Sequence, residues 1–557
     1  MAVRLGRKAR AVALACALVG TVVVSGGRAD AWKPATHEQA AFEAYDDAVD
    51  DGFVTVAGVQ VPVDPELLDA LRQYPESYRA GVLGPDAYPD IYVGQAMIHP
   101  DTVTDNDRLP PDPIRRSVTD DWLREVWRQS LLEPPGPERL KVRAFAAGFL
   151  THAAGDVWGH TFVNEFAKGV FPSITDVAEA PIAIRHVVVE GYVDHLRPVP
   201  AHDPARIADI DPPDAFITRV FITSDFARTH SDPVHFNLFL ARRAQLQSRV
   251  DADRALGASN PVARWLLGAR VSADLASIAE IDRGLAAWPA FSTRVAKALL
   301  AADADFPAAR DAAVEAGLST VLPMLGVPRL FGQWAIAYRN FVRQLKVRLG
   351  AIVQPFVDWI DGIVDQGIDL VLRNFIDISQ LPAPMKAVVD TNGDGRLSLA
   401  ELRGLSKVEL LVNTPAVLDP ADKARLDAAI GVGGDRTLFD TGSFAAFHDT
   451  SVMSRLILLN GDGLNELTAA LGVPGELYAA ASPADDNVML GWIRSIDGEY
   501  QWRANSLRAG DPRRFGTGTM PLWEDCQARD RVFRRIFAEP LPGAFADAGD
   551  ECSPLAA

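Results

Sequence analysis

The chain has 557 residues, a formal net charge of −18 and a hydrophobic content of 48%. This length allows two or three domains, and the apolar content excludes a chain that stays disordered. The negative charge repels long polyanions, so nucleic acid is the weaker candidate substrate, and it also disfavours simple electrostatic binding to anionic membranes.

The N-terminus has the pattern of a secretory signal peptide. Basic residues precede an apolar run over residues 11–24, and Ala29 and Ala31 occupy the small-residue positions of a cleavage site. The run is too short to span a membrane. We therefore predict a secreted protein whose signal peptide covers residues 1–31 and whose first mature residue is Trp32. The new α-amino group could bind a metal ion, which a peptide nitrogen does not readily do.

The remaining sequence predicts a mainly α-helical fold. Apolar residues recur at intervals of three and four, the period of a helix with one buried face. The segments with this pattern are 35–49, 63–74, 150–163, 182–196, 218–232, 241–256, 272–288, 331–353, 355–376, 419–430 and 449–459. We interpret 331–376 as helices that pack against the catalytic domain, with an amphipathic lipid contact as the alternative. The Pro- and Asp-rich segment 194–214 is expected to be a loop.

Metal-binding side chains occur on two of these predicted helices. His152, Asp156 and His160 are four residues apart, which places them on one helix face with the carboxylate in the middle. His186 and Glu190 form a second set with the same spacing. Either set alone would also fit an ordinary hydrogen bond between helix turns. Two sets so close in the chain, with nitrogen and oxygen donors and no thiolate, indicate zinc in an open site.

Further residues between the N-terminus and these helices complete a recognisable order. His37 follows Trp32, and Asp86 is followed thirteen residues later by His99, with Asp90 as an alternative to Asp86. An N-terminal Trp, a nearby His, H-x-x-x-D, another His and H-x-x-x-E together resemble the zinc-dependent phospholipase C and single-strand nuclease superfamily. The Asp-to-His spacing and the sequence DVWGH are most similar to the catalytic domain of glycosylphosphatidylinositol-specific phospholipase D.

The resemblance covers residues 32–190 and implies three zinc ions. It assigns one ion to Asp86, His99, His152 and Asp156, a second to His160, His186 and Glu190, and a third to Trp32, His37 and Asp156. Asp156 would then bridge two ions, and Asp86 would also act as a general base. Asp194, one turn beyond Glu190, is either a partner that orients a ligand or a solvated helix charge.

The chemistry of such a site is phosphodiester hydrolysis, because clustered zinc ions bind phosphoryl oxygens and lower the pKa of a bound water to about 7. We therefore expect a secreted zinc-dependent phosphodiesterase that hydrolyses phospholipids or a small phosphodiester, as a phospholipase of type C or D. The alternatives are a single-strand nuclease or nucleotidase on the same ions, and a non-catalytic, metal-stabilised surface or binding protein. Transient contact with a membrane surface is compatible with the phospholipase hypothesis.

A second metal motif, DTNGDGRLSLAE, has the spacing of an EF-hand calcium loop. Its ligand positions are occupied by Asp390, Asn392, Asp394, the carbonyl of Arg396, Ser398 and Glu401. The sequence contains no partner loop, and Pro382 and Pro384 leave little room for an entering helix. We predict one structural calcium ion and not a sensor, the alternative being an Asp- and Gly-rich turn that binds no ion.

The C-terminal part of the chain is less informative. An aromatic-rich stretch at 491–503 is interpreted as core packing or a ligand surface, and Cys526 and Cys552 are predicted to form one disulfide. The predicted organisation is a signal peptide (1–31), a catalytic domain (32–310), a helical region ending in the calcium loop 390–401 (311–410) and a C-terminal domain of unknown role (411–557).

Overall fold

The computed structural model describes a mainly α-helical protein, as the sequence predicts. The described residues are 34–90, 94, 118–168, 180–196, 209–230, 234–300, 320, 323–324, 379, 381–396, 398, 400–401, 408–431, 445–472, 487, 490 and 536. The signal peptide, the 331–376 helices, the 491–503 stretch and both C-terminal cysteines lie outside these residues. None of the helices within them is long and apolar enough to cross a bilayer.

The chain forms two compact units. The first unit comprises residues 1–26, 87–93 and 214–372, and the second comprises residues 27–86, 94–213 and 373–557. The elements of the first unit are α11 (Asp214–Ile217), a π-helical turn η4 (Thr218–Ile222), α12 (Asp225–His230), α13 (Val234–Ser259) and α14 (Pro261–Leu300). A single helix was expected over 218–232, but there the chain forms the π turn and then α12.

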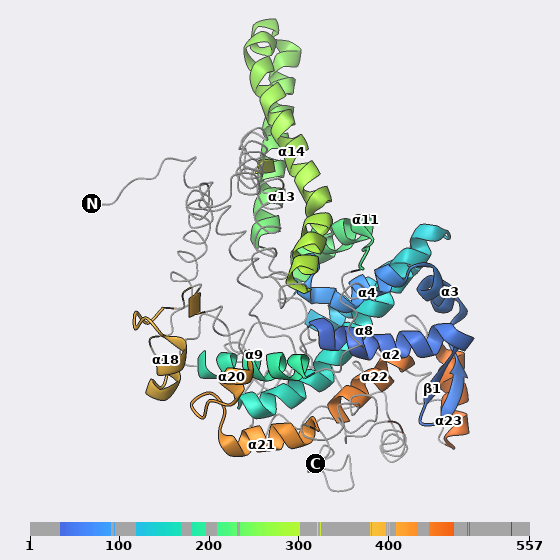
Figure 1. Cartoon of the computed structure of the whole chain (residues 1–557). Coiled ribbons are helices and arrows are strands. Elements are labelled where there is room, and N and C mark those ends of the chain that lie inside the picture. The colour runs from blue at the N-terminus through green and yellow to red at the C-terminus, as the bar shows by residue number, and fades with distance from the viewer. Residues whose placement is uncertain are drawn as a thin grey trace, which may run out of the picture. The chain divides into compact units, whose positions relative to one another are not determined.

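The second unit contains the other described elements (Figure 1). These are α2 (Pro34–Asp51), β1 (Phe53–Val56), β2 (Val59–Pro62), α3 (Pro65–Gln73), α4 (Pro75–Leu83), η2 (Gly84–Asp86), α7 (Val118–Leu131), α8 (Pro137–Ala167), α9 (Ala180–His195), α18 (Ala383–Val389), α20 (Val408–Val412), α21 (Pro420–Ala429), α22 (Ala445–Ile457) and α23 (Gly461–Ala470).

Helix α8 is the centre of the second unit. It packs against α2, α3, α4, α7, α9 and α22, and most of its side chains from Val142 to Ala154 are buried. A helix that is apolar on nearly all sides belongs in a core, because no face of it is stable in water. The residues on α8 are therefore held on all sides, which suits a helix that carries a functional site.

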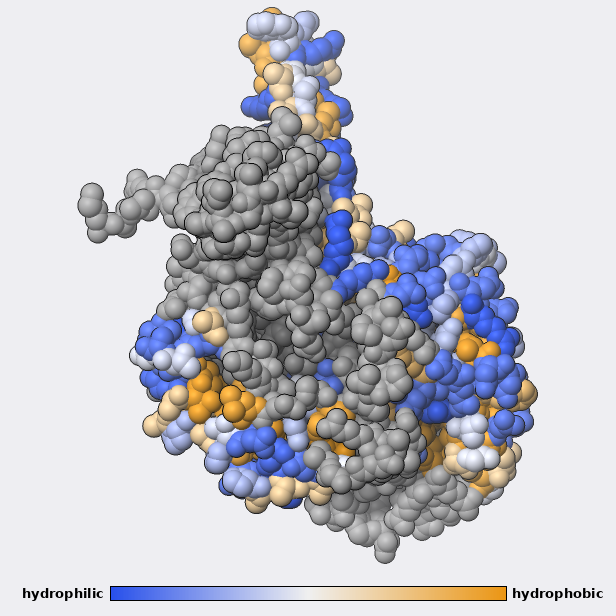
Figure 2. Space-filling model, in the orientation of Figure 1, coloured by the Kyte–Doolittle hydropathy of each residue, from blue (hydrophilic) through white to orange (hydrophobic). Residues whose placement is uncertain are grey.

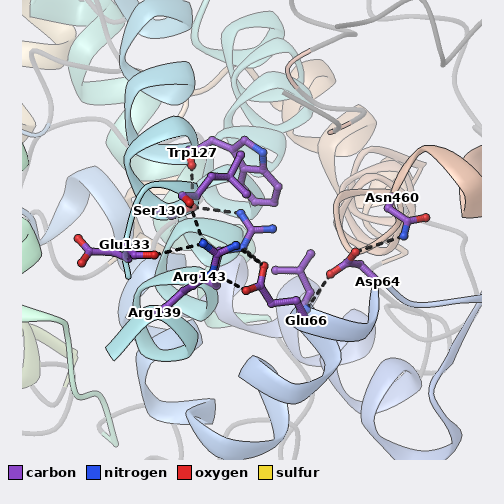
Figure 3. A network of polar contacts seen from close by, with 10 residues as sticks. Asp64, Glu66, Trp127, Ser130, Glu133, Arg139, Arg143 and Asn460 are labelled. Carbon is purple, nitrogen blue, oxygen red and sulfur yellow. Dashed lines mark hydrogen bonds and ion pairs between the residues drawn. The ribbon is translucent and has the colours of Figure 1, made fainter. Parts of the chain in front are cut away.

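The first turns of α8 are fixed by a polar network (Figure 3). Arg139 donates two hydrogen bonds to the Glu66 carboxylate on α3, at 2.5 and 3.0 Å, and Arg143 donates to Ser130 on α7 at 3.0 Å. The Arg143 guanidinium also lies 4.0 Å from the centre of the Trp127 ring. Paired, planar contacts of this kind fix orientation as well as distance. They fix the N-terminal turns of α8 relative to α3 and α7.

The β1–β2 hairpin has no counterpart among the predicted elements. The two strands are antiparallel, with Val56 paired to Val59, and Ala57 and Gly58 form the turn at φ values of 50° and 79°. Such a turn usually has Asn or Asp before the glycine, so Ala57 removed the usual signal for a hairpin.

The described C-terminal helices belong to the same unit as α2 and α8. Helix α22 packs against both, with Ser451 Oγ donating to Glu43 at 2.7 Å and Arg455 Nε donating to Asp47 at 2.7 Å. Further along, the Asp64 amide donates to the Leu458 carbonyl at 2.9 Å. Residues 445–459 therefore contribute directly to the core that surrounds the N-terminal helices.

Candidate metal centre

His152 and Asp156 project from the buried part of α8, one turn apart. Nδ1 of His152 lies 2.8 Å from the carbonyl oxygen of Val82 on α4. A carbonyl can only accept, so Nδ1 carries the proton and the lone pair of His152 is on Nε2. That lone pair faces Asp156 Oδ2 at 3.3 Å and Asp86 Oδ1 at 3.9 Å. The hydrogen bond to Val82 thus orients the ring so that Nε2 faces two carboxylates.

His37 brings a second imidazole to the same point from α2. Its Nε2 lies 3.5 Å from Asp156 Oδ1, and its ring stacks on that of His152 with centroids 4.0 Å apart and 12° between the planes. Stacked imidazoles are most stable when they are not both charged, and the neutral form is the one that binds metals. Each oxygen of Asp156 is therefore directed at a different histidine.

The spacing of these donor atoms fits a metal ion. Two ligands about 2.1 Å from one tetrahedral zinc ion lie about 3.4 Å from each other. The His152–Asp156 and His37–Asp156 separations are 3.3 and 3.5 Å, and ligand atoms of His37, Asp86 and His152 all fall within 4.8 Å of one another. All four side chains are buried, and buried carboxylates are stable only when a cation or strong donors compensate them. The residues present could hold a metal ion.

Glycines allow the two chain segments behind this cluster to meet. A Cβ on Gly148 of α8 would lie 2.2 Å from the Tyr78 carbonyl oxygen, and one on Gly81 of α4 would lie 2.1 Å from the Phe145 carbonyl oxygen. The backbones of α4 and α8 thus touch where they cross. Gly84, at a φ of 44°, then turns the chain beside the His152 ring, so that Asp86 follows within two residues.

The second predicted ligand pair lies on α9. His186 and Glu190 are buried, and His186 Nε2 is 2.7 Å from Glu190 Oε1. That separation is shorter than the spacing of two ligands on one zinc ion, so the two atoms would have to move apart by roughly 0.7 Å to share a metal. The structure confirms that the two side chains face each other on one side of the helix.

Asp194 connects α9 to α2. Its Oδ1 accepts hydrogen bonds from the backbone nitrogen and the hydroxyl of Thr36, at 3.1 and 2.8 Å. The amide of Thr36 lies in the first turn of α2, where no intrahelical carbonyl is available, so Asp194 caps that helix. Since His37 is the next residue, the carboxylate positions a site histidine through the backbone and not through the imidazole ring.

A buried polar group that was not predicted from the sequence lies behind the cluster. Burial raises the pKa of Tyr78, its hydrogen bond with Thr151 lowers it, and the nearby Glu38 carboxylate raises it further. The phenol therefore stays protonated at any physiological pH and lies 3.3 Å from the hydroxyl of Thr151, the residue before His152. Glu38, directly after His37, is fully buried. Its position in α2 next to a predicted ligand is the sequence signal that could have identified it.

Other predicted ligands are not placed by the structure. Trp32 and His99 lie outside the described residues, and for His160 only the helical backbone is described, on α8. Asp90, the alternative to Asp86, accepts a hydrogen bond from Trp288 Nε1 at 2.9 Å inside the first unit. Asp86 is the carboxylate that joins His37 and His152.

The predicted calcium loop is folded around its first and last carboxylates. Asp390 Oδ2 accepts from the Gly395 amide at 3.1 Å, while Oδ1 is buried and accepts no hydrogen bond from the described residues. Burial alone would raise the pKa of Glu401, but hydrogen bonds from Ser398, Asn392 and Thr391 outweigh it and hold that pKa below its ordinary value. Contrary to the expectation drawn from the prolines, α18 enters the loop, because Pro382 and Pro384 occupy its N-terminal positions, where proline is tolerated.

Comparison of the chain with known protein families, with curated proteins and with solved structures gave no match.

Proposed function

We propose that this protein is a zinc-dependent phosphodiesterase that hydrolyses phospholipids, as a phospholipase of type C or D. The observation that carries the proposal is the convergence of His37, Asp86, His152 and Asp156, which come from α2, η2 and α8, in one buried cluster with metal-like spacing. These are four of the nine ligands implied by the resemblance to the zinc phospholipase C superfamily. Their order in the chain, and not only their type, supports that resemblance.

The chain's own residues have distinct tasks in this proposal. When bound, zinc ions supply positive charge for the phosphoryl oxygens and an activated water at neutral pH. Asp156 would contribute one oxygen to each of two ions, because its two oxygens face different histidines. Asp86, whose Oδ1 lies 3.9 Å from His152 Nε2, would serve as general base for such a water. The Val82 carbonyl fixes the ring of His152, and Asp194 fixes the start of α2.

The other ligand assignments form part of the same proposal. His186 and Glu190, with His160 of α8, would hold a further zinc ion, and α8 and α9 pack against each other. Trp32 and His99 would complete the set of three ions. The signal-peptide pattern of residues 1–31 supports secretion, where Trp32 would have a free amino group.

A phospholipid is favoured over a nucleic acid on electrostatic grounds. The chain carries a net charge of −18, and a protein of that charge repels a long polyanion along its whole length. A single phosphodiester head group presents one negative charge, which a cluster of zinc ions can neutralise locally. Single-stranded DNA is therefore the comparison substrate in the test.

The test combines metal analysis with hydrolysis. The purified mature protein should contain zinc and should hydrolyse phosphatidylcholine or phosphatidylinositol, and a chelator should abolish the activity. Release of diacylglycerol identifies type C and release of phosphatidic acid identifies type D. Asp156→Asn should lose both activity and more than one equivalent of zinc, whereas Asp462→Asn, which removes an exposed charge in the first turn of α23, should change neither.

Three results would reject the proposal. Cleavage of single-stranded DNA without lipid hydrolysis would favour the nuclease alternative. Tightly bound zinc with no hydrolysis of any phosphodiester would favour a non-catalytic, metal-stabilised protein. Unchanged zinc content in Asp156→Asn would remove the bridging role on which the mechanism depends.

We also propose that residues 390–401 bind one calcium ion. Asp390 is more than nine-tenths buried; one of its oxygens accepts from Gly395, and the other accepts no hydrogen bond from the described part of the chain. Lys386 Nζ lies 3.6 Å from Oδ2 of the same carboxylate, and its positive charge weakens cation binding. We therefore expect an affinity in the range of extracellular calcium modules, about 10⁻⁴–10⁻³ M. Such a site stabilises the loop and does not act as a switch.

A further inference from the structure

Helices α13 and α14 of the first unit form a long antiparallel hairpin (Figure 1). Three arginine–aspartate pairs join the two helices, each with Arg Nε 2.6 Å from a carboxylate oxygen: Arg243–Asp282, Arg249–Asp274 and Arg270–Asp253. In successive pairs the residue number on α13 rises while that on α14 falls, as expected for two antiparallel helices. Val250, Ile278 and Ile281 are buried between the helices. The hairpin is thus a defined rod and not a pair of independent helices.

The end of this rod is a tight turn. Asn260 is the single residue between the two helices, and its Oδ1 accepts from the amides of Val262 and Ala263 at 3.0 and 3.1 Å, which caps α14. Gly257 lets the second helix approach, and Arg264 Nε donates to its carbonyl at 3.0 Å. The backbone of the tip is therefore satisfied within the hairpin itself.

The side chains of the tip are not covered. Four of the eight large apolar residues that are exposed among the described residues fall within 256–266. Their exposed fractions are 54% for Leu256, 65% for Val262, 81% for Trp265 and 61% for Leu266. Figure 2 shows apolar and hydrophilic residues together at this end of the hairpin. A concentration of this kind on a soluble surface marks a contact with another molecule.

The charge of the tip is opposite to that of the chain. Residues 254–269 contain Arg254 and Arg264 and no Asp or Glu, whereas the whole chain has a net charge of −18. Arg270, the next residue, is neutralised by its pairing with Asp253. Tryptophan, leucine and arginine in one short segment are the composition that partitions into the interfacial layer of a bilayer, with arginine side chains reaching the phosphates. Anionic head groups attract such a segment over about a Debye length.

We propose that the tip of the α13–α14 hairpin, residues 256–266, inserts into a phospholipid surface and prefers an anionic one. The apolar residues cluster at the end of a rod, as insertion requires, and do not line a groove that would receive a peptide. A second copy of the chain is disfavoured because it would bring the arginines of two tips, Arg254 and Arg264 of each, together. The proposal rests on the proposed function and extends it: the substrate would be lipid in a membrane or vesicle. The binding itself can be measured without catalysis.

The test is co-sedimentation of the full chain with vesicles of phosphatidylcholine alone and of phosphatidylcholine mixed with phosphatidylserine. The chain should partition more strongly to the mixed vesicles. A double variant, Trp265→Ser with Leu266→Ser, should partition at least about tenfold more weakly. The matched control is Leu132→Ser, which removes a leucine that is 64% exposed on the second unit and should bind as the wild type does.

Two further readouts separate insertion of the tip from adsorption of the protein at the vesicle surface. The tryptophan emission of the wild type should shift to shorter wavelength on vesicle addition, and Trp265→Phe should lose most of that shift while still sedimenting with the vesicles. Arg254→Gln should weaken binding to the mixed vesicles more than to phosphatidylcholine alone. Far-UV circular dichroism of each variant should match the wild type, because the substituted side chains are exposed and the Asn260 cap is unchanged.

The outcomes are decisive for the tip independently of the enzyme. Equal vesicle binding by the wild type and the double variant, or no binding by the wild type to either vesicle, would overturn the proposal. A wild-type dimer that the double variant converts to a monomer would instead assign the tip to self-association. Hydrolysis of a soluble short-chain phospholipid should be the same in wild type and double variant. If neither hydrolyses it, the proposed function fails while the binding result stands.

Discussion

At the crossing of α4 and α8, we expect Gly148→Ala to destabilise the protein, whereas helix propensity alone predicts that it stabilises the protein. Replacing Gly148 with alanine should stabilise an isolated helix by roughly 1 kcal/mol. In the folded protein, however, the new Cβ would lie 2.2 Å from the Tyr78 carbonyl oxygen and 2.8 Å from the Val82 amide nitrogen. Both contacts are with backbone atoms, which cannot rotate away as a side chain can.

The magnitude follows from how far α4 must move. An ordinary contact needs about 3.4 Å, so the helices must separate by roughly 1 Å at this point, and overpacking of this size costs about 1–3 kcal/mol. After subtraction of the gain in propensity, we expect Gly148→Ala to lower the free energy of unfolding by up to about 2 kcal/mol. The same displacement moves the Val82 carbonyl away from His152 and Asp86 away from the cluster, so metal affinity should fall as well.

Urea unfolding followed by circular dichroism, together with zinc content after dialysis, measures both effects. The matched control is Gly268→Ala, in the interior of α14, where nothing lies within 4 Å of the added Cβ. That variant should be stabilised by about 0.5–1 kcal/mol and should keep its metal. If Gly148→Ala is as stable as the wild type and retains zinc, the close crossing does not hold the site together and the reasoning is wrong.

Other predictions address single contacts. Asp194→Ala removes both hydrogen bonds to Thr36 and should cost about 1 kcal/mol of stability and about tenfold in zinc affinity, whereas Asp194→Asn should retain most of each; equal metal binding in all three proteins would contradict the capping role. The hydrogen bonds from Arg139 hold the pKa of Glu66 below 4.5, so this pair stabilises the fold above that pH and the contribution is lost as the pH falls through the lower folded pKa. Glu66→Gln should therefore have a lower melting temperature than the wild type at pH 7, with a difference that shrinks in acid; a constant difference would argue against an ionic contribution. Calcium should raise the melting temperature of the wild type at millimolar concentration, as expected for about 10⁻⁴–10⁻³ M affinity, but not that of Asp390→Asn, and an equal rise in both would place the ion elsewhere.

The helical positions of the candidate site could be predicted because they depend on local geometry alone. The repeat of 3.6 residues per turn places His152 and Asp156, and likewise His186 and Glu190, on the same helix face one turn apart, wherever the helices lie in the fold. The structure confirms both pairs, with side chains facing and buried. The helical periods of 35–49, 63–74 and 419–430 were likewise sufficient to predict α2, α3 and α21.

Contacts between distant segments could not be predicted in the same way. Asp194 is a candidate partner of a ligand from its sequence position, and the structure gives it Thr36, which is 158 residues away. Asp90 competes with Asp86 in the sequence, and only the packed chain assigns Asp90 to Trp288. The glycine contacts of α4 with α8 have no local signal, because the sequence around a helical glycine does not show whether another backbone packs against it.

The amino-acid sequence by itself determined the helical class and the two histidine–carboxylate pairs that face each other, since both follow from the spacing of residues along one helix. The tertiary structure brings His37 and Asp86 to His152 and Asp156, a grouping that the family resemblance had implied. The tertiary structure alone decided that residues 445–459 pack against α2 and α8, and that an arginine-bearing apolar turn ends the α13–α14 hairpin. The physical reason is the same in each case. Backbone hydrogen bonding sets the arrangement within a helix, whereas the approach of two helices depends on close packing of side chains far apart in the chain.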